Sequence, residues 1–293
     1  MERILQRIHA PGSFSLPLPR GVICAIFFPL ILSLLLYLFL YLSPLPRSSA
    51  MAMEQMDFFY FNPDSVQSNF SLLTKEIDHF FTSKGYQTRF QAFSQQSDFD
   101  LLLATRRPAL VLVPAWYYEQ YGNEIGLTPL LTPLNGNKPS YTKVLLERSS
   151  SGNNGGLTGK TLAVTSMGIN TDKQLALFFN NGRTFDFANS HLIITPKDAD
   201  ALYALALGQV DLAVVGKNTM EAVGAVNKKI LQVVAEVAPS KPVPMPLLCT
   251  LNGTMSREEI ARLKQIFLST AGRRPLPEFM AMLQFNGWQN AML

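Results

Sequence analysis

The sequence predicts an α/β protein of two lobes, each a mostly parallel sheet flanked by helices, preceded by a hydrophobic amino-terminal helix. Residues 158–216 read as strand, turn, helix, strand, helix, strand, and residues 57–113 read as strand, helix, strand, helix, strand. Alternating short strands and helices are typical of a parallel sheet covered on both faces, which binds ligands at the carboxyl ends of its strands. The length of 293 residues is enough for two lobes with separate cores.

The elements of the second lobe have clear ends. Residues 160–166 form a short apolar strand that stops in small polar residues, and residues 170–172 open a helix. Residues 198–207 form a helix with one apolar face, which Gly208 closes, and residues 209–215 form another buried strand.

In the first lobe, residues 57–61 form the first strand, and Asp64 or Ser65 is expected to cap the helix that follows. Apolar residues then recur at spacings of four and three, which predicts one amphipathic helix that ends before Gly85. The apolar positions are Val66, Phe70, Leu73, Ile77, Phe80 and Phe81. The remaining elements are a strand at 86–93, a helix at 98–106 and a strand at 109–113.

About 45 residues after the third strand are rich in Gly, Pro, Asn and Ser, and we expect an exposed turn there, above all at 149–156. Residues 232–250 are expected to form an extended return crossing. A capping box at 256–259 opens a helix that runs to about Thr270, and residues 277–287 support a last short helix. The expected organisation is a membrane or signal segment with its linker at 1–52, lobe 1 at 53–156, lobe 2 at 157–231, and completion of lobe 1 at 232–293.

Residues 21–43 carry no charge and are long enough to span the ~30 Å hydrocarbon core of a membrane. Arg3, Arg7 and Arg20 precede this segment, so the chain after it is expected outside the cytoplasm. The small residues of 50–52 have the form of a cleavage site, so both a retained anchor and a cleaved signal remain open.

Charge and reactive groups exclude several functions. The four arginines and one glutamate of residues 1–52 account for +3 of the formal charge of +4, so residues 53–293 carry only +1 and show no basic footprint for nucleic acid. Cys249 is the one cysteine of this part and is expected to be a small buried hydrophobe. The histidines have no metal-ligand spacing, and no nucleophile motif is present. We therefore expect no enzyme, no cofactor and no metal.

Several segments are similar to one family, the periplasmic substrate-binding proteins of phosphate, phosphite and phosphonate ABC transporters. The similarity extends over residues 56–290 and rests on their order and spacing. The matching segments are Asn62 and Pro63 after the first strand, 113–117 after the third strand, 157–160, 205–211 and 283–287.

This resemblance implies a two-lobed periplasmic-binding-protein fold of type 2 that closes on a ligand. It implies a ligand-contacting tyrosine at Tyr117, and a turn at 165–171 whose hydroxyls and backbone amides hold the oxygens of the ligand. The turn has fewer hydroxyls than that family often has. Gly216 and Lys217 stand where the family often has an acidic residue.

The candidate ligand-binding residues lie at strand ends and at the start of the second-lobe helix. Backbone amides at a helix amino terminus favour anions, although Thr171 or Asp172 could simply cap that helix. The alternative role for Tyr117 is packing within its lobe. The alternative for Tyr60 and Asn62 is capping of the next helix. The candidates are Tyr60, Asn62, Tyr117, Thr165, Ser166, Asn170 and Thr171.

The leading functional hypothesis is an extracytoplasmic solute-binding protein that captures a small anionic, phosphate-like or phosphonate-like ligand for an ABC permease. The alternative is a membrane-anchored sensor of the same fold that acts on a signalling partner. The long uncharged segment, without a lipid-attachment cysteine after it, is compatible with the sensor.

Overall fold

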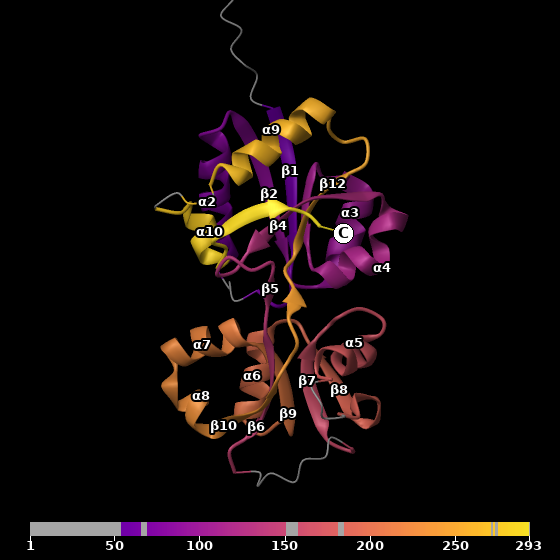
Figure 1. Ribbon diagram of the computed structural model, residues 1–293, viewed down its shortest axis with the longest axis vertical. Helices are drawn as coiled ribbons and strands as arrows, with labels where there is room; N and C mark the ends of the chain where they lie inside the picture. The colour runs from indigo at the N-terminus through magenta and orange to yellow at the C-terminus, as the bar shows by residue number, and fades with distance from the viewer. Residues whose placement is uncertain are drawn as a thin grey trace, which may run out of the picture. The chain divides into compact units, whose positions relative to one another are not determined.

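The computed structural model describes residues 54–65, 69–150, 158–180, 185–270, 272 and 275–292 (Figure 1). The predicted hydrophobic helix at 21–43 and the cleavage site at 50–52 lie outside these residues. Within the described ranges, no helix is long and apolar enough to cross a membrane.

The first lobe is built on a six-stranded sheet. Strands β1, β2 and β3 are parallel, while β12 runs antiparallel to β3 and β4, and β13 runs antiparallel to β4. In sheet order, the strands are β13 (Gly287–Asn290), β4 (Leu127–Leu134), β12 (Leu247–Leu251), β3 (Leu110–Val113), β1 (Glu54–Phe61) and β2 (Tyr86–Phe93).

The helices of the first lobe cover both faces of this sheet. Side chains of α2, α9 and α10 share one core with Phe58 and Tyr60 of β1. Those of α3 and α4 share another with Phe59 and Phe61. The helices are α2 (Phe70–Thr82), α3 (Gln96–Arg106), α4 (Ala115–Ile125), α9 (Arg257–Leu268) and α10 (Glu278–Met282).

The run of aromatic residues in β1 follows from this arrangement. Successive side chains of a strand point to opposite faces, so a strand covered on both sides can be apolar at every position. Phe58, Phe59, Tyr60 and Phe61 are all buried. Each fully buried aromatic or aliphatic side chain of this kind contributes about 1.5–3 kcal/mol relative to an exposed one.

The second lobe is built on a five-stranded sheet in which β7 pairs in parallel with β8 and β9, and β6 pairs antiparallel with β9 and β10. In sheet order, the strands are β10 (Val234–Pro239), β6 (Lys143–Arg148), β9 (Leu212–Gly216), β7 (Thr161–Thr165) and β8 (His191–Thr195). Its helices are α5 (Thr171–Phe178), α6 (Asp198–Ala206), α7 (Lys217–Val226) and α8 (Lys228–Val233), with a 3-10 turn at Phe187–Asn189.

Two short antiparallel strands, β5 (Ser140–Tyr141) and β11 (Val243–Pro244), form the crossing between the lobes (Figure 1). The chain enters the second lobe directly after β5 through β6, and it returns through β10 and β11 to β12. The extended return crossing predicted at 232–250 is therefore present, although its first part, β10, belongs to the second sheet.

The predicted fold class is confirmed, with three corrections to its elements. The sheets are mixed, because β4, β6, β10, β12 and β13 add antiparallel pairings to the parallel strands. The second sheet takes in β6 and β10, on either side of the 157–231 range expected for lobe 2. The first part of the stretch predicted as an exposed turn contains α4, β4, β5 and β6, because its apolar residues, such as Leu131 and Leu145, are fully buried despite the prolines and glycines around them. Its last part, 151–157, lies outside the described residues.

The cap predicted for the first helix is also different. The helix α2 begins at Phe70, and the side chain of Asn69 accepts a hydrogen bond from Leu72 N–H. Asp64 does not cap it, because its carboxylate is bound to the second lobe instead. The predicted capping box of Ser256 and Glu259 is present at the start of α9.

Candidate functional site

Three charged side chains are buried together between the lobes. Asp64 follows β1 in the first lobe, whereas Lys143 begins β6 and Asp198 begins α6 in the second. The ammonium nitrogen of Lys143 lies 2.8 Å from Asp64 Oδ1 and 3.3 Å from Asp198 Oδ1. Removing an ion from water costs several kcal/mol, so such groups persist in a protein interior only with close partners.

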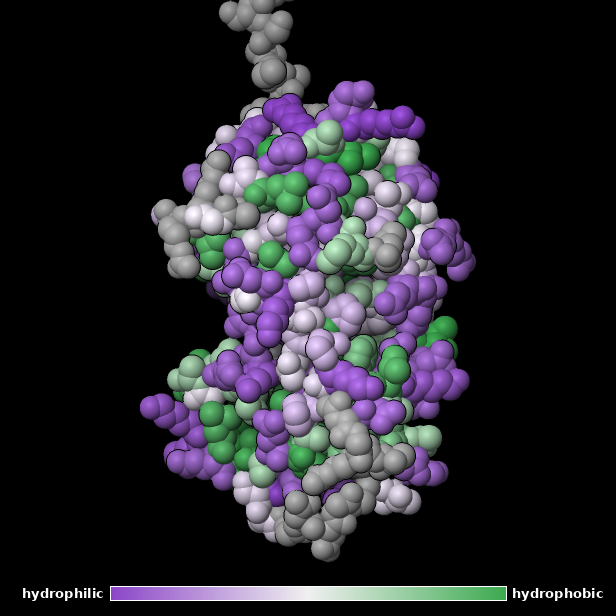
Figure 2. Space-filling view, viewed as in Figure 1, coloured by the Kyte–Doolittle hydropathy of each residue, from purple (hydrophilic) through white to green (hydrophobic). Residues whose placement is uncertain are grey.

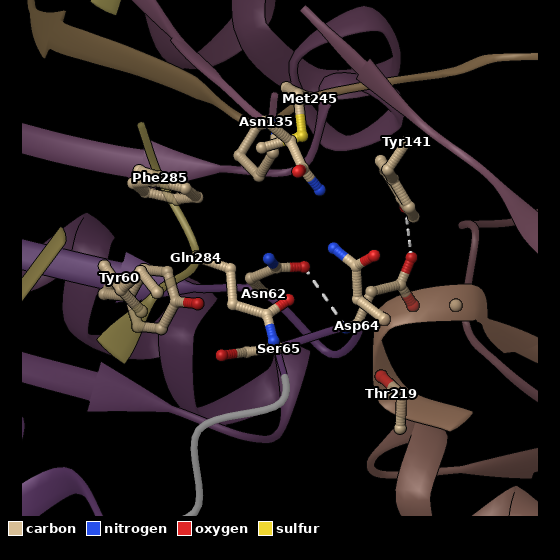
Figure 3. Close-up of a pocket in the computed structure, with 14 residues that line it drawn as sticks. Tyr60, Asn62, Asp64, Ser65, Asn135, Tyr141, Thr219, Met245, Gln284 and Phe285 are labelled. Atoms are coloured by element: carbon tan, nitrogen blue, oxygen red, sulfur yellow. Dashed lines mark hydrogen bonds between the residues drawn. The ribbon is translucent and has the colours of Figure 1, made fainter. Parts of the chain in front are cut away.

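Hydrogen bonds complete this ionic cluster. Thr165 Oγ1 donates to Asp64 Oδ1 at 2.5 Å and accepts from Lys143 Nζ at 3.1 Å. The hydroxyl of Tyr141, in the hinge strand β5, also donates to Asp64 (Figure 3). The carboxylate of Asp64 is therefore bound by hinge and second-lobe donors, much as an external anion would be.

The two carboxylates respond differently to their shared ammonium. Burial raises the pKa of Asp64, but the charge of Lys143 and the hydrogen bonds from Thr165 and Tyr141 outweigh burial and hold that pKa below its ordinary value. Burial, and then the negative charge of Asp64, raise the pKa of Asp198 to about 7. We therefore assign the firm ion pair to Lys143 and Asp64, whereas the burial of Asp198 favours its neutral form.

A cleft opens beside this cluster on the side of α7 and α10, and we call it the α7–α10 cleft. It is visible as a notch between the lobes in Figure 2. First-lobe residues Tyr60, Asn62, Asn135, Gln284 and Phe285 line it together with Gly216, Asn218 and Thr219 of the second lobe (Figure 3). The space between the lining atoms of its inner part is about 450 Å³, open solvent included.

A second recess lies on the opposite side of the hinge, between α4 and α5. Asn62 and Tyr141 reach this recess as well as the α7–α10 cleft. Its other lining residues include Trp116, Glu119, Met167, Gln174 and Phe178.

The structure brings only some of the predicted ligand-binding residues to the α7–α10 cleft. Tyr60 and Asn62 line it, and burial raises the pKa of Tyr60 to about 12, so its hydroxyl stays protonated. Thr165 lies in the ionic cluster. Tyr117 lies elsewhere: its hydroxyl donates to Asp100 at 2.6 Å and its ring lines a surface groove between α3 and α4.

The other three predicted residues lie at the start of α5, where protein groups already use the donors of the turn. Met167 N–H donates to Thr171 Oγ1 at 3.0 Å, and Gly168 N–H donates to Ser166 Oγ at 3.1 Å. Asn170 precedes the helix and makes no side-chain capping bond.

Gln120 of the first lobe bridges to the same turn. Its Nε2 donates to Met167 O at 2.9 Å, and its Oε1 accepts from Ile169 N–H at 3.2 Å. The backbone of Gly168 adopts φ +87°, and a Cβ there would stand 1.9 Å from Gln120 Oε1, so this close contact depends on glycine. The first lobe is thus bound to the turn that precedes α5.

Sequence reasoning missed Lys143, Asp198 and Thr219. Lys143 is a charged residue at the start of the apolar stretch 144–146, and this could have marked it as a buried ion in need of a partner. The acidic first turn of α6 could equally have been a helix cap, and Thr219 carries no sequence signal that we recognise.

Two lobes joined by crossing strands, with a polar cleft between them, define a solute-binding protein of the periplasmic-binding-protein type. The chain belongs to the family described as ABC transporter, phosphonate, periplasmic substrate-binding protein, which matches residues 58–292. This family consists of transport proteins located in the periplasm. No curated protein sequence matches this chain.

Solved structures share the fold at low sequence identity. A binding protein component of an ABC phosphonate transporter from Pseudomonas aeruginosa has a TM-score of 0.66 at 14% identity, covering 82% of each chain. PhnD1 from Prochlorococcus marinus, in complex with methylphosphonate, has a TM-score of 0.64 at 10% identity, covering 81% of this chain and 93% of that one. A histidine kinase sensor domain with similarity to periplasmic binding proteins has a TM-score of 0.51 at 20% identity, covering 78% and 94%.

Proposed function

We propose that this protein captures a small oxoanion, of the phosphate or phosphonate kind, in the α7–α10 cleft and delivers it to the permease of an ABC importer. The observation that carries this proposal is the lining of the cleft. Amide and hydroxyl groups from both lobes meet there, so a ligand bound between them would hold the lobes together. Periplasmic binding proteins are known to close around ligands by such a hinge.

The charged side chains at the cleft limit which oxoanions we expect to bind. Among the described residues that line the inner part of the cleft, Asp64 is the one charged side chain, and its carboxylate is bound to Lys143, Thr165 and Tyr141. Glu221 lines only the outer part. Among the described residues of the inner part, no free carboxylate is therefore left to pair with an ammonium group on the ligand. We therefore expect ethylphosphonate to bind at least as tightly as 2-aminoethylphosphonate.

Titration calorimetry on the purified full chain tests the proposal with phosphate, methylphosphonate, ethylphosphonate and 2-aminoethylphosphonate. We expect saturable binding of at least one of the four, at one site per chain. Mass spectrometry of ligand that co-purifies with the protein provides an independent identification. A chain that binds none of the four and carries no oxoanion would contradict the proposed function.

The alternative is a membrane-anchored sensor. The uncharged segment at 21–43 favours it, because a retained helix could contact the helix of a signalling protein in the membrane. Crosslinking in membranes separates the two roles, since an importer component should capture a permease and a sensor should capture a histidine kinase. In both roles we propose that residues 53–293 lie outside the cytoplasm. A carboxyl-terminal reporter that is active only in the cytoplasm should therefore stay inactive.

A further inference from the structure

The amino terminus of α7 faces the α7–α10 cleft. The first N–H groups of an α-helix have no acceptor within the helix. At α7, Lys217 N–H donates to Thr142 O at 2.9 Å, and the preceding Gly216 N–H donates to Asp198 Oδ2 at 2.6 Å. The next two residues, Asn218 and Thr219, also belong to this first turn, and both line the cleft.

The hydroxyl of Thr219 supplies an independent sign of a ligand. Thr219 is 2% exposed, and within the described part of the chain its Oγ1 has no hydrogen-bond partner. Figure 3 shows the side chain at the start of α7, facing the space beside Asp64 and Ser65. A buried hydroxyl without a partner destabilises the fold, so a site that keeps one is expected to use it.

The two second-lobe helices that begin near the hinge therefore differ. In the turn that precedes α5, the N–H groups of Met167, Gly168 and Ile169 all donate to side chains of the protein. At α7, a buried hydroxyl and the N–H groups beside it face the cleft. An incoming anion would have to displace Gln120 from the turn before α5, whereas within the described ranges no group is hydrogen-bonded to the Thr219 hydroxyl at α7.

We propose that the oxoanion group of the ligand binds at the amino terminus of α7, with the Thr219 hydroxyl as a direct donor, rather than at the amino terminus of α5. The partial positive charge of a helix amino terminus favours such a group. Phe285 and Met245 line the same cleft and provide apolar surface for a short organic substituent. The ligand class is thus a small organic phosphonate or a related oxoanion. This inference rests on the proposed function and assigns its binding group to particular residues.

The test is the affinity of the full chain for methylphosphonate, measured by titration calorimetry with the variants Thr219→Val and Thr219→Ser. Valine matches the shape of threonine without its hydroxyl, so we expect binding to weaken roughly 10- to 100-fold, as for loss of a hydrogen bond to a charged group. Serine retains the hydroxyl and should stay within a few-fold of wild type.

Thermal unfolding without ligand supplies a second readout. Thr219→Val removes an unpartnered buried hydroxyl, so the midpoint should stay equal or rise while affinity falls. If Thr219 had a purely structural role, Thr219→Val would not lower the affinity while leaving the thermal midpoint equal or higher. The matched control is Thr88→Val, because Thr88 Oγ1 is likewise buried without a partner but lies on β2 and lines none of the described pockets. Its midpoint should behave similarly, with affinity unchanged.

Ser166→Ala tests the competing position at α5. Unchanged affinity in Thr219→Val, with a loss in Ser166→Ala, would overturn the inference and leave the proposed function intact. If wild type binds none of the four probe oxoanions and carries no oxoanion, the proposed function fails and the assignment of Thr219 fails with it. Weaker binding in Thr219→Val alone would support both.

Discussion

The Lys143 ammonium lies 2.8 Å from the Asp64 carboxylate, and this buried ion pair joins the second lobe to the first. The two residues come from opposite sides of the hinge, so the contact exists only while the lobes are together. It also places a carboxylate of the protein itself next to Thr165, where the family resemblance implied a ligand.

Replacing Lys143 by methionine should strongly destabilise the protein. The substitution keeps most of the side-chain volume but leaves the carboxylates of Asp64 and Asp198 buried without a cation. We expect the free energy of unfolding to fall by roughly 3–5 kcal/mol in denaturant titrations. Lys138→Met, at an exposed position before β5, is the matched control and should change it by less than about 0.5 kcal/mol. A loss below about 1 kcal/mol for Lys143→Met would show that the pair is not important for stability.

Asp64→Asn should weaken the connection between the lobes with a smaller cost in stability than Lys143→Met. The ammonium of Lys143 keeps Asp198 at 3.3 Å, so it is not left unpaired. Without ligand, small-angle scattering should give a larger radius of gyration for the variant, because the interlobe ion pair is lost. Asp57→Asn changes an ion pair with Arg89 within the first lobe and should leave the radius unchanged. Equal radii for all three proteins would mean that Gln120 and the hinge strands suffice to hold the lobes.

Stability should fall as the pH rises through neutrality. Burial and the charge of Asp64 raise the pKa of Asp198 to about 7 in the folded protein, from an ordinary 3.8. The folded state therefore binds more protons than the unfolded state between these values. The stabilisation is fully present below pH 3.8 and is lost as the pH passes 7, by at most about 1.4 kcal/mol per pH unit.

Denaturant titrations from pH 5 to 8 measure this dependence, with Asp198→Asn as the comparison. Asparagine resembles the protonated carboxyl and can still accept from Gly216 N–H, so its curve should be flatter. All other titratable groups are common to both proteins, so the difference between the curves isolates Asp198. Parallel curves would show that Asp198 does not titrate in this range.

Tyr117→Phe should leave the affinity for methylphosphonate within about twofold of wild type, contrary to the role that the family resemblance implied. The hydroxyl donates to Asp100, and the ring contacts Phe61 and Phe99, away from the α7–α10 cleft. Loss of that hydrogen bond should lower the free energy of unfolding by about 0.5–1.5 kcal/mol. Calorimetry measures the affinity and denaturant titration measures the free energy of unfolding. A large loss of affinity would indicate that Tyr117 does contact the ligand.

The order of strands and helices in both lobes could be predicted because it depends on local pattern. The aromatic run of β1, the apolar spacing of α2 and the capping box of α9 each report burial or capping within a few residues. The strand β4 was missed because its sequence contains Pro129 and Pro133, which argue against a strand when neighbouring strands are unknown. In the sheet, it lies between β12 and β13, and these pairings outweigh the local signal.

The sequence by itself determined the two-lobed α/β class, the family and the placement of Tyr60 and Asn62 at the carboxyl end of a strand. Tertiary structure decided which polar groups are satisfied within the protein and which are left for a ligand. Thr165 meets Asp64 across 101 residues, and Lys143 meets Asp198 across 55. Donors at the start of α5 and α7 look alike in sequence. Only the position of Gln120 against α5, and the open cleft at α7, distinguish them, because hydrogen bonding depends on distances in space that local sequence does not encode.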